Sequence, residues 1–137
     1  MDENRALMER LRDATTSGDL SQLSRLMDES ATDDFVQEWP QSGERIRGKE
    51  AFAKINDSYS GETGSNPKAT FRRLTGEGNT YVLEGTIDYG DGTPVSYVSI
   101  AELENGKVRR LTEYFANPFE APEWRRGMVE RMEPSGA

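Results

Sequence analysis

The 137-residue sequence contains neither cysteine nor histidine. Without cysteine there can be no disulfide, no thiol nucleophile and no thiolate metal ligand. Without histidine, a serine–histidine triad, a histidine-ligated zinc site and an imidazole general base are excluded as well. Any proton transfer must therefore use carboxylates, tyrosines, lysines or water, and we expect no cofactor and no metal site.

The sequence also lacks a basic surplus and any long apolar run. Its 25 acidic and 17 basic residues give a net charge of −8, which opposes phosphate backbones and anionic membrane surfaces, so we expect no nucleic-acid partner. No apolar run approaches the length of a membrane span, and the N-terminus Met-Asp-Glu-Asn-Arg lacks the basic start and apolar core of a signal peptide. We therefore expect no membrane association and a cytoplasmic location.

The apolar periodicity predicts helices first and strands afterwards. Asp2 and Asp19 are expected to cap two amphipathic helices, and a third helix is expected over Lys49–Tyr59. A short strand-like run follows Asp33 and ends at Pro40. From residue 68 the apolar residues recur with period two, which predicts strands over Ala69–Thr75, Thr80–Tyr89, Val95–Leu103 and Val108–Phe115. This order indicates an α+β domain with an antiparallel sheet.

The length suits one domain, which we assign to residues 1–132, with a frayed tail at 133–137. The last helix is expected over Glu123–Met132. Its Trp124, Met128 and Met132 recur at helical spacing, and we expect them to pack on the sheet.

Hairpin registers predict which side chains share a face. A two-residue turn at Asp91-Gly92 would put Thr86 opposite Tyr97 and Glu84 opposite Ser99, all four on one face. Leu83, Ile87, Val98 and Ile100 would then share the other face.

The next hairpin has two possible registers. A two-residue Asn105-Gly106 turn would put Glu113 opposite Val98. A three-residue loop with a glycine bulge would instead put Glu113 opposite Tyr97, on the face of Glu84, and would turn Leu111 and Phe115 inward. We prefer the bulged loop because the other register would bury Arg110.

The end of the chain resembles a known family. The order of hairpin, strand, Glu113-Tyr-Phe, proline and aromatic tail resembles a nuclear transport factor 2-like fold of the SnoaL-like kind. Residues 105–116 are similar to limonene-1,2-epoxide hydrolases, in which a Gly-Lys-Ile turn leads to Arg-Asp-Tyr-Phe-Asp. The resemblance implies a cone-shaped, curved antiparallel sheet wrapped by N-terminal helices (a cystatin-like roll), a small-molecule pocket, and Glu113 as the catalytic base.

The same resemblance assigns four further positions. The family's water-positioning Tyr and Asn fall at Val36 and Glu38, and its Arg and second Asp fall at Glu84 and Thr86. Among these five positions only Glu113 keeps the family's chemistry.

The residues themselves suggest a carboxylate cluster as the catalytic site. If Glu38, Glu84 and Glu113 converge in a partly dry cavity, repulsion and desolvation should raise the pKa of at least one and leave a shared proton. Alternatively, Arg45 or Arg47 neutralises the cluster, or the cluster holds a cationic ligand or a hard metal ion. The residues expected to contact a substrate are Trp39, Tyr97, Thr86, Ser99, Phe115 and Arg47.

Two hypotheses follow for the function. The first is cofactor-free acid/base chemistry on a small hydrophobic or cationic ligand, of isomerase, dehydratase, cyclase or hydrolase type. The second is a non-catalytic module that binds a ligand or a partner. The face opposite the pocket is expected to be apolar, which would favour a homodimer through the outer face of the sheet. The residues predicted for that face are Tyr81, Leu83, Ile87, Tyr89, Val98 and Ile100.

Overall fold

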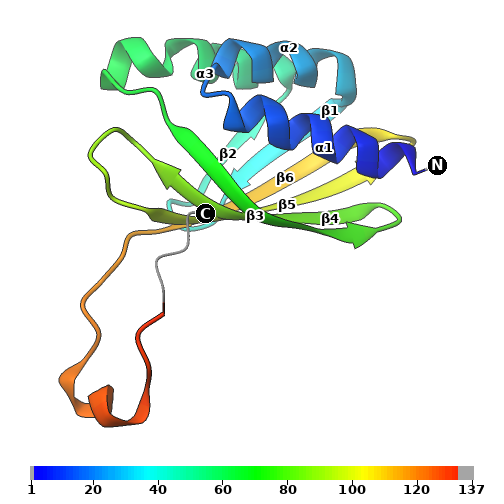
Figure 1. Cartoon of the computed structure of the whole chain (residues 1–137). Coiled ribbons are helices and arrows are strands. Elements are labelled where there is room, and N and C mark those ends of the chain that lie inside the picture. Colours follow the sequence, from blue (N-terminus) through cyan, green and yellow to red (C-terminus); the bar gives the residue numbers. More distant parts are fainter. Residues whose placement is uncertain (1, 133–137) are drawn as a thin grey trace.

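The computed structural model describes residues 2–132, so the tail predicted at 133–137 lies outside the described part. One curved sheet of six strands is covered on one side by three helices (Figure 1). The helices are α1 Glu3–Thr16, α2 Leu20–Ser30, α3 Lys49–Thr63 and the 3-10 helix η1 Glu123–Met128. The strands are β1 Ala31–Trp39, β2 Glu44–Arg47, β3 Lys68–Glu77, β4 Thr80–Asp88, β5 Val95–Glu104 and β6 Lys107–Ala116.

The sheet order is β2-β1-β6-β5-β4-β3, and the predicted α+β class is confirmed. One detail differs from the antiparallel sheet that was predicted. β1 pairs with β6 in parallel, whereas every other neighbouring pair is antiparallel. This parallel pair brings the middle of β1 beside the middle of β6, from opposite ends of the sequence.

Both predicted helix caps are present. The Asp2 side chain accepts from the backbone N–H of Arg5, and the Asp19 side chain accepts from the N–H groups of Ser21 and Gln22. Asp2 also accepts a 2.9 Å hydrogen bond from the buried Tyr81 hydroxyl. The start of α1 is thereby tied to β4.

No helix within residues 2–132 has the length and apolar character to cross a bilayer.

The core lies between the helices and the concave face of the sheet. Phe35 of β1 meets Phe52 of α3 edge to face, with ring centroids 5.5 Å apart. The remaining buried apolar side chains of this cluster are Leu7, Met8, Leu11, Met27, Ala31, Ile46, Tyr81, Leu83, Ala101, Leu103, Val108 and Leu111.

The register predicted for β4 and β5 is wrong by one residue. The two strands are joined by a six-residue connection over 89–94, so Leu83 faces Ser99 and Glu84 faces Val98. Because side chains alternate along a strand, this shift moves Glu84 to the outer face of the sheet. Leu83 lies on the concave face instead, where its side chain is buried.

Glu113 lies on the predicted face of the sheet, but the hairpin between β5 and β6 differs from the predicted three-residue loop. Asn105 and Gly106 form a tight turn with φ of 52° and 78°, and Glu104 pairs with Lys107. A bulge at Arg109 then shifts the register, because Leu103 pairs with Val108 and Glu102 with Arg110. Glu113 consequently lies opposite Ser99 and points toward the helices.

A second bulge bends the sheet around the helices. β3 carries one extra residue between Phe71, which pairs with Gly85, and Arg73, which pairs with Glu84. A Cβ added to Gly85 would lie 2.0 Å from the Thr70 carbonyl oxygen. Only glycine therefore allows β3 to approach β4 so closely at this point.

The end of the described chain differs most from expectation. The 3-10 helix Glu123–Met128 replaces the predicted helix to Met132 and does not pack on the sheet. Trp124, Met128 and Met132 are 74%, 71% and 77% exposed, so the packing predicted for them is wrong. Residues 117–132, hereafter the C-terminal arm, extend away from the sheet on the side opposite α1–α3 (Figure 1).

Candidate active site

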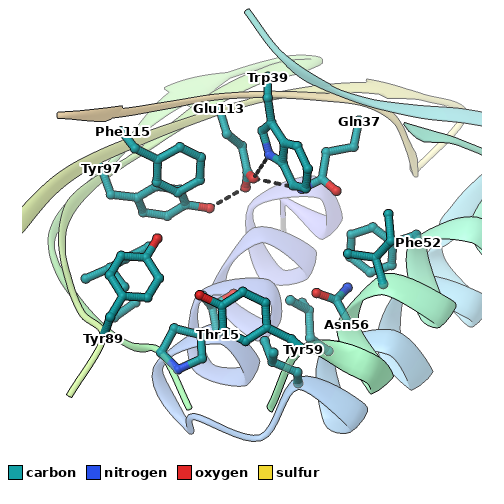
Figure 2. A pocket seen from close by; sticks show the side chains of 16 residues that line it. Thr15, Gln37, Trp39, Phe52, Asn56, Tyr59, Tyr89, Tyr97, Glu113 and Phe115 are labelled. Atoms are coloured by element: carbon teal, nitrogen blue, oxygen red, sulfur yellow. Dashed lines mark hydrogen bonds between the residues drawn. The ribbon is translucent and has the colours of Figure 1, made fainter. Parts of the chain in front are cut away.

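A cavity of about 130 Å³ lies between the concave face of the sheet and the helices (Figure 2). Its walls are mostly apolar, and six aromatic side chains contribute to them. The polar lining side chains are few, and Glu113 is the one charged group among them. The lining residues are Thr15, Leu20, Leu23, Gln37, Trp39, Phe52, Ile55, Asn56, Tyr59, Pro67, Ala69, Ile87, Tyr89, Tyr97, Glu113 and Phe115.

The Glu113 carboxylate accepts four hydrogen bonds from side chains of β1 and β5. Oε1 accepts from Gln37 Nε2 at 2.7 Å and from Trp39 Nε1 at 3.1 Å. Oε2 accepts from the Tyr97 hydroxyl and from Ser99 Oγ at 3.2 Å. Since every partner donates, the arrangement fits the ionised carboxylate, which only accepts.

Glu113 is a buried anion without a cation beside it. Its side chain is only 7% exposed, and among the described residues no Lys or Arg forms an ion pair with it. Removing a carboxylate from water is costly unless hydrogen bonds replace the lost hydration. Four donors supply that replacement, and each bond to a charged group contributes about 1.5–3 kcal/mol.

Tyr97 is fixed by both ends of its side chain. Its ring stacks on Phe115 with centroids 5.1 Å apart, and it packs obliquely on Phe71 at 5.8 Å. Burial, with the charge of Glu113 as the second cause, raises the pKa of Tyr97 well above its ordinary value. The hydroxyl therefore stays protonated and remains a hydrogen-bond donor at every physiological pH.

The side of the pocket facing Glu113 carries a second set of polar groups. Asn56 and Tyr59 come from α3, and Tyr89 follows β4 (Figure 2). Burial, followed by the charges of Tyr59 and Glu113, raises the pKa of Tyr89 to about 12. Ile55 is 41% exposed and Tyr59, Pro67 and Tyr89 are half-buried, so the pocket opens to solvent at this end.

The predicted convergence of three carboxylates is wrong, because Glu84 and Glu38 lie on the outer face of the sheet. The slipped β4–β5 register carries Glu84 there, where it pairs with Arg73 at 2.5 Å. Glu38 alternates with the inward Gln37 and Trp39 and pairs with Arg45 at 2.7 Å. The hydrogen bond from each arginine is the main cause that lowers the pKa of its carboxyl partner.

Two other predicted contacts also lie outside the pocket. Thr86 faces the exposed Ser96 on the outer side of the sheet. Arg47 is exposed on β2 opposite Val36, and it helps Arg45 and Arg110 to lower the pKa of Glu38. The structure thus brings together Glu113, Trp39, Tyr97, Ser99 and Phe115, but not Glu38, Glu84, Thr86 or Arg47.

Gln37, which donates the shorter bond to Oε1, was not among the predicted site residues. The strand period contained the signal, because Phe35, Gln37 and Trp39 recur at every second position and must share one face. Gln37 and Trp39 therefore face the pocket, whereas Val36 and Glu38, the positions assigned from the resemblance, lie on the other face of β1. The helix residues Asn56 and Tyr59 gave no sequence signal beyond ordinary amphipathicity.

A metal role is not supported by the geometry of the acids. Within residues 2–132 no three or more carboxylates are grouped so that they could hold a metal ion. Arginine was predicted as an alternative partner that neutralises the carboxylates. On the outer face, Arg45 pairs with Glu38 and Arg73 pairs with Glu84, as two separate ion pairs.

Comparisons with known proteins agree with this architecture. The family model described as a SnoaL-like domain matches residues 8–111. An NTF2-like protein of unknown function from Burkholderia xenovorans LB400 is 36% identical in sequence, and the match covers 96% of each chain with a TM-score of 0.75. No curated protein matches this chain.

Two more distant structures show the same fold. A protein provisionally named a ketosteroid isomerase, from Kribbella flavida DSM 17836, is 24% identical; the match covers 96% of this chain and 91% of that chain, with a TM-score of 0.80. An LEH-like epoxide hydrolase of M. tuberculosis is 20% identical; the match covers 77% of this chain and 80% of that chain, with a TM-score of 0.58.

Proposed function

Because the chain belongs to the SnoaL-like domain family of NTF2-like proteins, we propose that its pocket binds a small apolar molecule and moves a proton on it, with Glu113 as the base. The observation that carries this proposal is the position of the Glu113 carboxylate in the pocket. It is a buried carboxylate, free of ion pairs, in a cavity whose other walls are neutral. A carboxylate placed in this way can reach a C–H bond of a molecule bound in the cavity, and no cation of the described chain competes for its oxygens.

The size of the cavity limits the substrate. Its volume of about 130 Å³ is close to the roughly 150 Å³ of an engineered apolar cavity that binds benzene. A molecule of one or two rings is therefore the appropriate size. The aromatic walls formed by Trp39, Tyr97 and Phe115 favour a flat apolar skeleton.

A single carboxylate favours reactions that return the proton. The base takes a proton from an acidic C–H bond, and the electron pair moves toward a neighbouring carbonyl. In an isomerisation the same carboxyl then gives the proton back at another carbon. In a cyclisation the enolate carbon instead forms a bond to the carbon of a second carbonyl, whose C=O π bond breaks, and the carboxyl returns the proton to that carbonyl's oxygen. Epoxide opening needs a separate acid to protonate the oxygen, and the pocket holds neither a second carboxyl group nor an arginine.

Tyr97 has a further part in this proposal. When Glu113 takes up a proton, one of its oxygens changes from an acceptor to a donor, so one of the four donors loses its acceptor. The Tyr97 hydroxyl, which points at Oε2 and stays protonated, is then available to the oxyanion of the substrate. The Tyr89 hydroxyl and the Asn56 amide, on the facing wall, are the other available donors.

The test is hydrogen exchange in a probe of matching size. 2-Tetralone, a flat two-ring ketone with acidic C–H bonds, is incubated with the protein in D₂O and followed by ¹H NMR. We expect loss of the signal at C1 faster than in buffer. Exchange at the buffer rate over a panel of small enolisable ketones would refute proton transfer in this pocket.

The charge of Glu113, which no cation of the described chain neutralises, also favours a second function, the binding of an organic cation. Glu113 and the surrounding aromatic rings could hold an organic cation without any reaction, through charge and cation–π attraction. The net charge of −8 would attract such a ligand. Binding of 2-aminotetralin, compared with uncharged tetralin of the same shape, separates the two functions. Tight binding of the amine without exchange of the ketone would favour the non-catalytic pocket.

We also propose that two chains pair through the outer face of the sheet. The apolar patch there differs from the predicted one, because Tyr81, Leu83 and Ile87 are buried on the concave face. Adjacent strands instead place Val82 beside Ile100 and Val98 beside Tyr114. The Glu84–Arg73 pair borders this patch on one side, and the Glu38–Arg110 pair borders it on the other. Sedimentation of the Val98→Lys variant tests this pairing, which the variant should abolish.

A further inference from the structure

The C-terminal arm concentrates most of the exposed large apolar side chains of the described chain. Residues 2–132 contain seven such side chains, and five of them lie in the arm, with exposed fractions of 52–81%. These five are Phe119, Trp124, Met128, Val129 and Met132. Large apolar side chains that are exposed together on one segment indicate a surface that another surface covers.

The arm is held apart from the body of its own chain. No hydrogen bond or ion pair among the described residues joins 117–132 to the sheet or to the helices. Its one ion pair is internal, between Arg126 and Glu123 at 2.8 Å. Pro118 and Pro122 restrict the backbone, which lowers the entropy lost when the arm docks on another surface.

The arm is shaped like a hook. It leaves β6, turns through η1 and comes back toward the sheet (Figure 1). Its residues enclose a hollow of about 350 Å³ that no residue of the sheet or of α1–α3 lines. Pro122 and Val129 provide apolar walls of this hollow. The hook can therefore receive a side chain or a loop from another molecule.

We propose that the arm of each chain packs against a second copy of this chain, so that two arms are exchanged across a two-fold axis. The arm lies on the side of the sheet opposite the helices, which is the side that the outer apolar patch faces (Figure 1). This inference rests on the sheet-face pairing proposed above, and adds to it the segment that completes the interface. A two-fold arrangement lets both arms make the same contacts and leaves no arm uncovered.

The area of the arm agrees with a dimer contact. A stable interface buries about 800 Å² on each partner. Burial of the two aromatic side chains, Phe119 and Trp124, contributes about 150–250 Å² each, so they alone supply roughly half of that area. The outer patch with Val82, Val98, Ile100 and Tyr114 would supply part of the remainder.

The charge of the arm permits contact with a second copy of this acidic chain. Two molecules with a net charge of −8 repel each other. Within the arm, however, three arginines balance three glutamates, namely Arg125, Arg126, Arg131, Glu120, Glu123 and Glu130. The arm can therefore approach the acidic body of another copy without the repulsion that the two bodies experience.

Sedimentation equilibrium of the full chain tests the exchange. The test variant carries Phe119→Ser together with Trp124→Ser, and the control carries Arg126→Ala, which breaks the ion pair inside the arm. All three side chains are exposed, so the fold of the body should persist, and circular dichroism checks this. We expect the dimer dissociation constant to rise about 30-fold or more in the double variant, as for truncated hot-spot aromatics, and by less than about 3-fold in the control.

Three results would overturn the exchange of arms. These are a full-length chain that is monomeric at every concentration, a double variant that dimerises as tightly as the full chain, and a control variant weakened as much as the double variant. The pocket proposal is tested separately, because exchange of 2-tetralone should be unchanged in the double variant. Loss of dimerisation in Val98→Lys alone would support the sheet pairing but not the arms.

Discussion

The Tyr97 hydroxyl donates a hydrogen bond to Glu113 from the neighbouring strand, two residue pairs away along the sheet. The Tyr97 ring stacks at the same time on Phe115, the next inward residue of β6. Two successive inward residues of β6 therefore hold the two ends of this tyrosine. The arrangement predicts effects on stability and on titration that do not depend on the identity of the substrate.

Tyr97→Phe removes one donor from the buried carboxylate and keeps the ring. We expect the free energy of unfolding to fall by about 1.5–3 kcal/mol, because the lost bond is to a charged group. The matched control is Tyr114→Phe, one strand position from Glu113 but 41% exposed on the outer face, where we expect a change within about 0.5 kcal/mol. Urea denaturation measures both. Equal losses in the two variants would contradict the assigned role of the Tyr97 hydroxyl.

Tyr89 and Tyr97 should ionise late in the folded protein. Burial raises the pKa of Tyr89 to about 12 and that of Tyr97 well above its ordinary value of about 10. A folded-state pKa above the unfolded value gives stability that is complete below pH 10 and is lost as the pH rises toward the folded values. We expect the absorbance of ionised tyrosine to appear in part only on alkaline unfolding. Complete ionisation near pH 10 in a folded chain would contradict the burial of Tyr97.

The outer carboxyls should titrate early. Hydrogen bonds from Arg45 and Arg73 lower the pKa of Glu38 and Glu84 below the ordinary glutamate value. Their stabilisation is present above that ordinary value and is lost as the pH falls through the lowered pKa, and it is small because the pairs are partly solvated. Carbon-detected NMR of the glutamate carboxyls measures this. In Arg73→Ala the pKa of Glu84 should rise while that of Glu38 stays unchanged.

Gly85 sets the bend of the sheet. In Gly85→Ala the new Cβ would meet the Thr70 carbonyl oxygen at 2.0 Å, so the backbones of β3 and β4 must separate. We expect a loss of about 1–3 kcal/mol, typical of overpacking. Gly61→Ala is the control, because nothing lies within 4 Å of its Cβ in the last turn of α3, and it should stabilise by up to about 1 kcal/mol. Thermal unfolding that ranks the two variants in the opposite order would refute the close approach.

The sequence predicted α1–α3, the strands other than β2 and the inward direction of Glu113, because amphipathic periods and turn residues are local signals. It did not predict the length of the connection after β4. Asp91-Gly92 has the composition of a tight turn, but the chain uses six residues there, and the one-residue shift sends Glu84 outward. For Glu113 the bulge at Arg109 had the effect that was expected from a longer loop.

The C-terminal arm shows another limit of sequence patterns. The spacing of Trp124, Met128 and Met132 is that of a helix face, and such a face normally packs on its own domain. Periodicity identifies the side chains that need a covering surface, but it does not identify the chain that provides this surface. The parallel pairing of β1 with β6, which places Gln37 beside Glu113, is a contact over 76 residues and has no local signal either.

The most direct measurement of the central claim is the rate of deuterium exchange at C1 of 2-tetralone with Glu113→Gln beside the unaltered chain. General base catalysis contributes about 10²–10⁴-fold, so the variant should exchange at least about 100-fold more slowly. Arg73→Ala, which alters only the outer face, should exchange at the unaltered rate. Exchange by a folded Glu113→Gln variant at the rate of the unaltered chain would contradict Glu113 as the base.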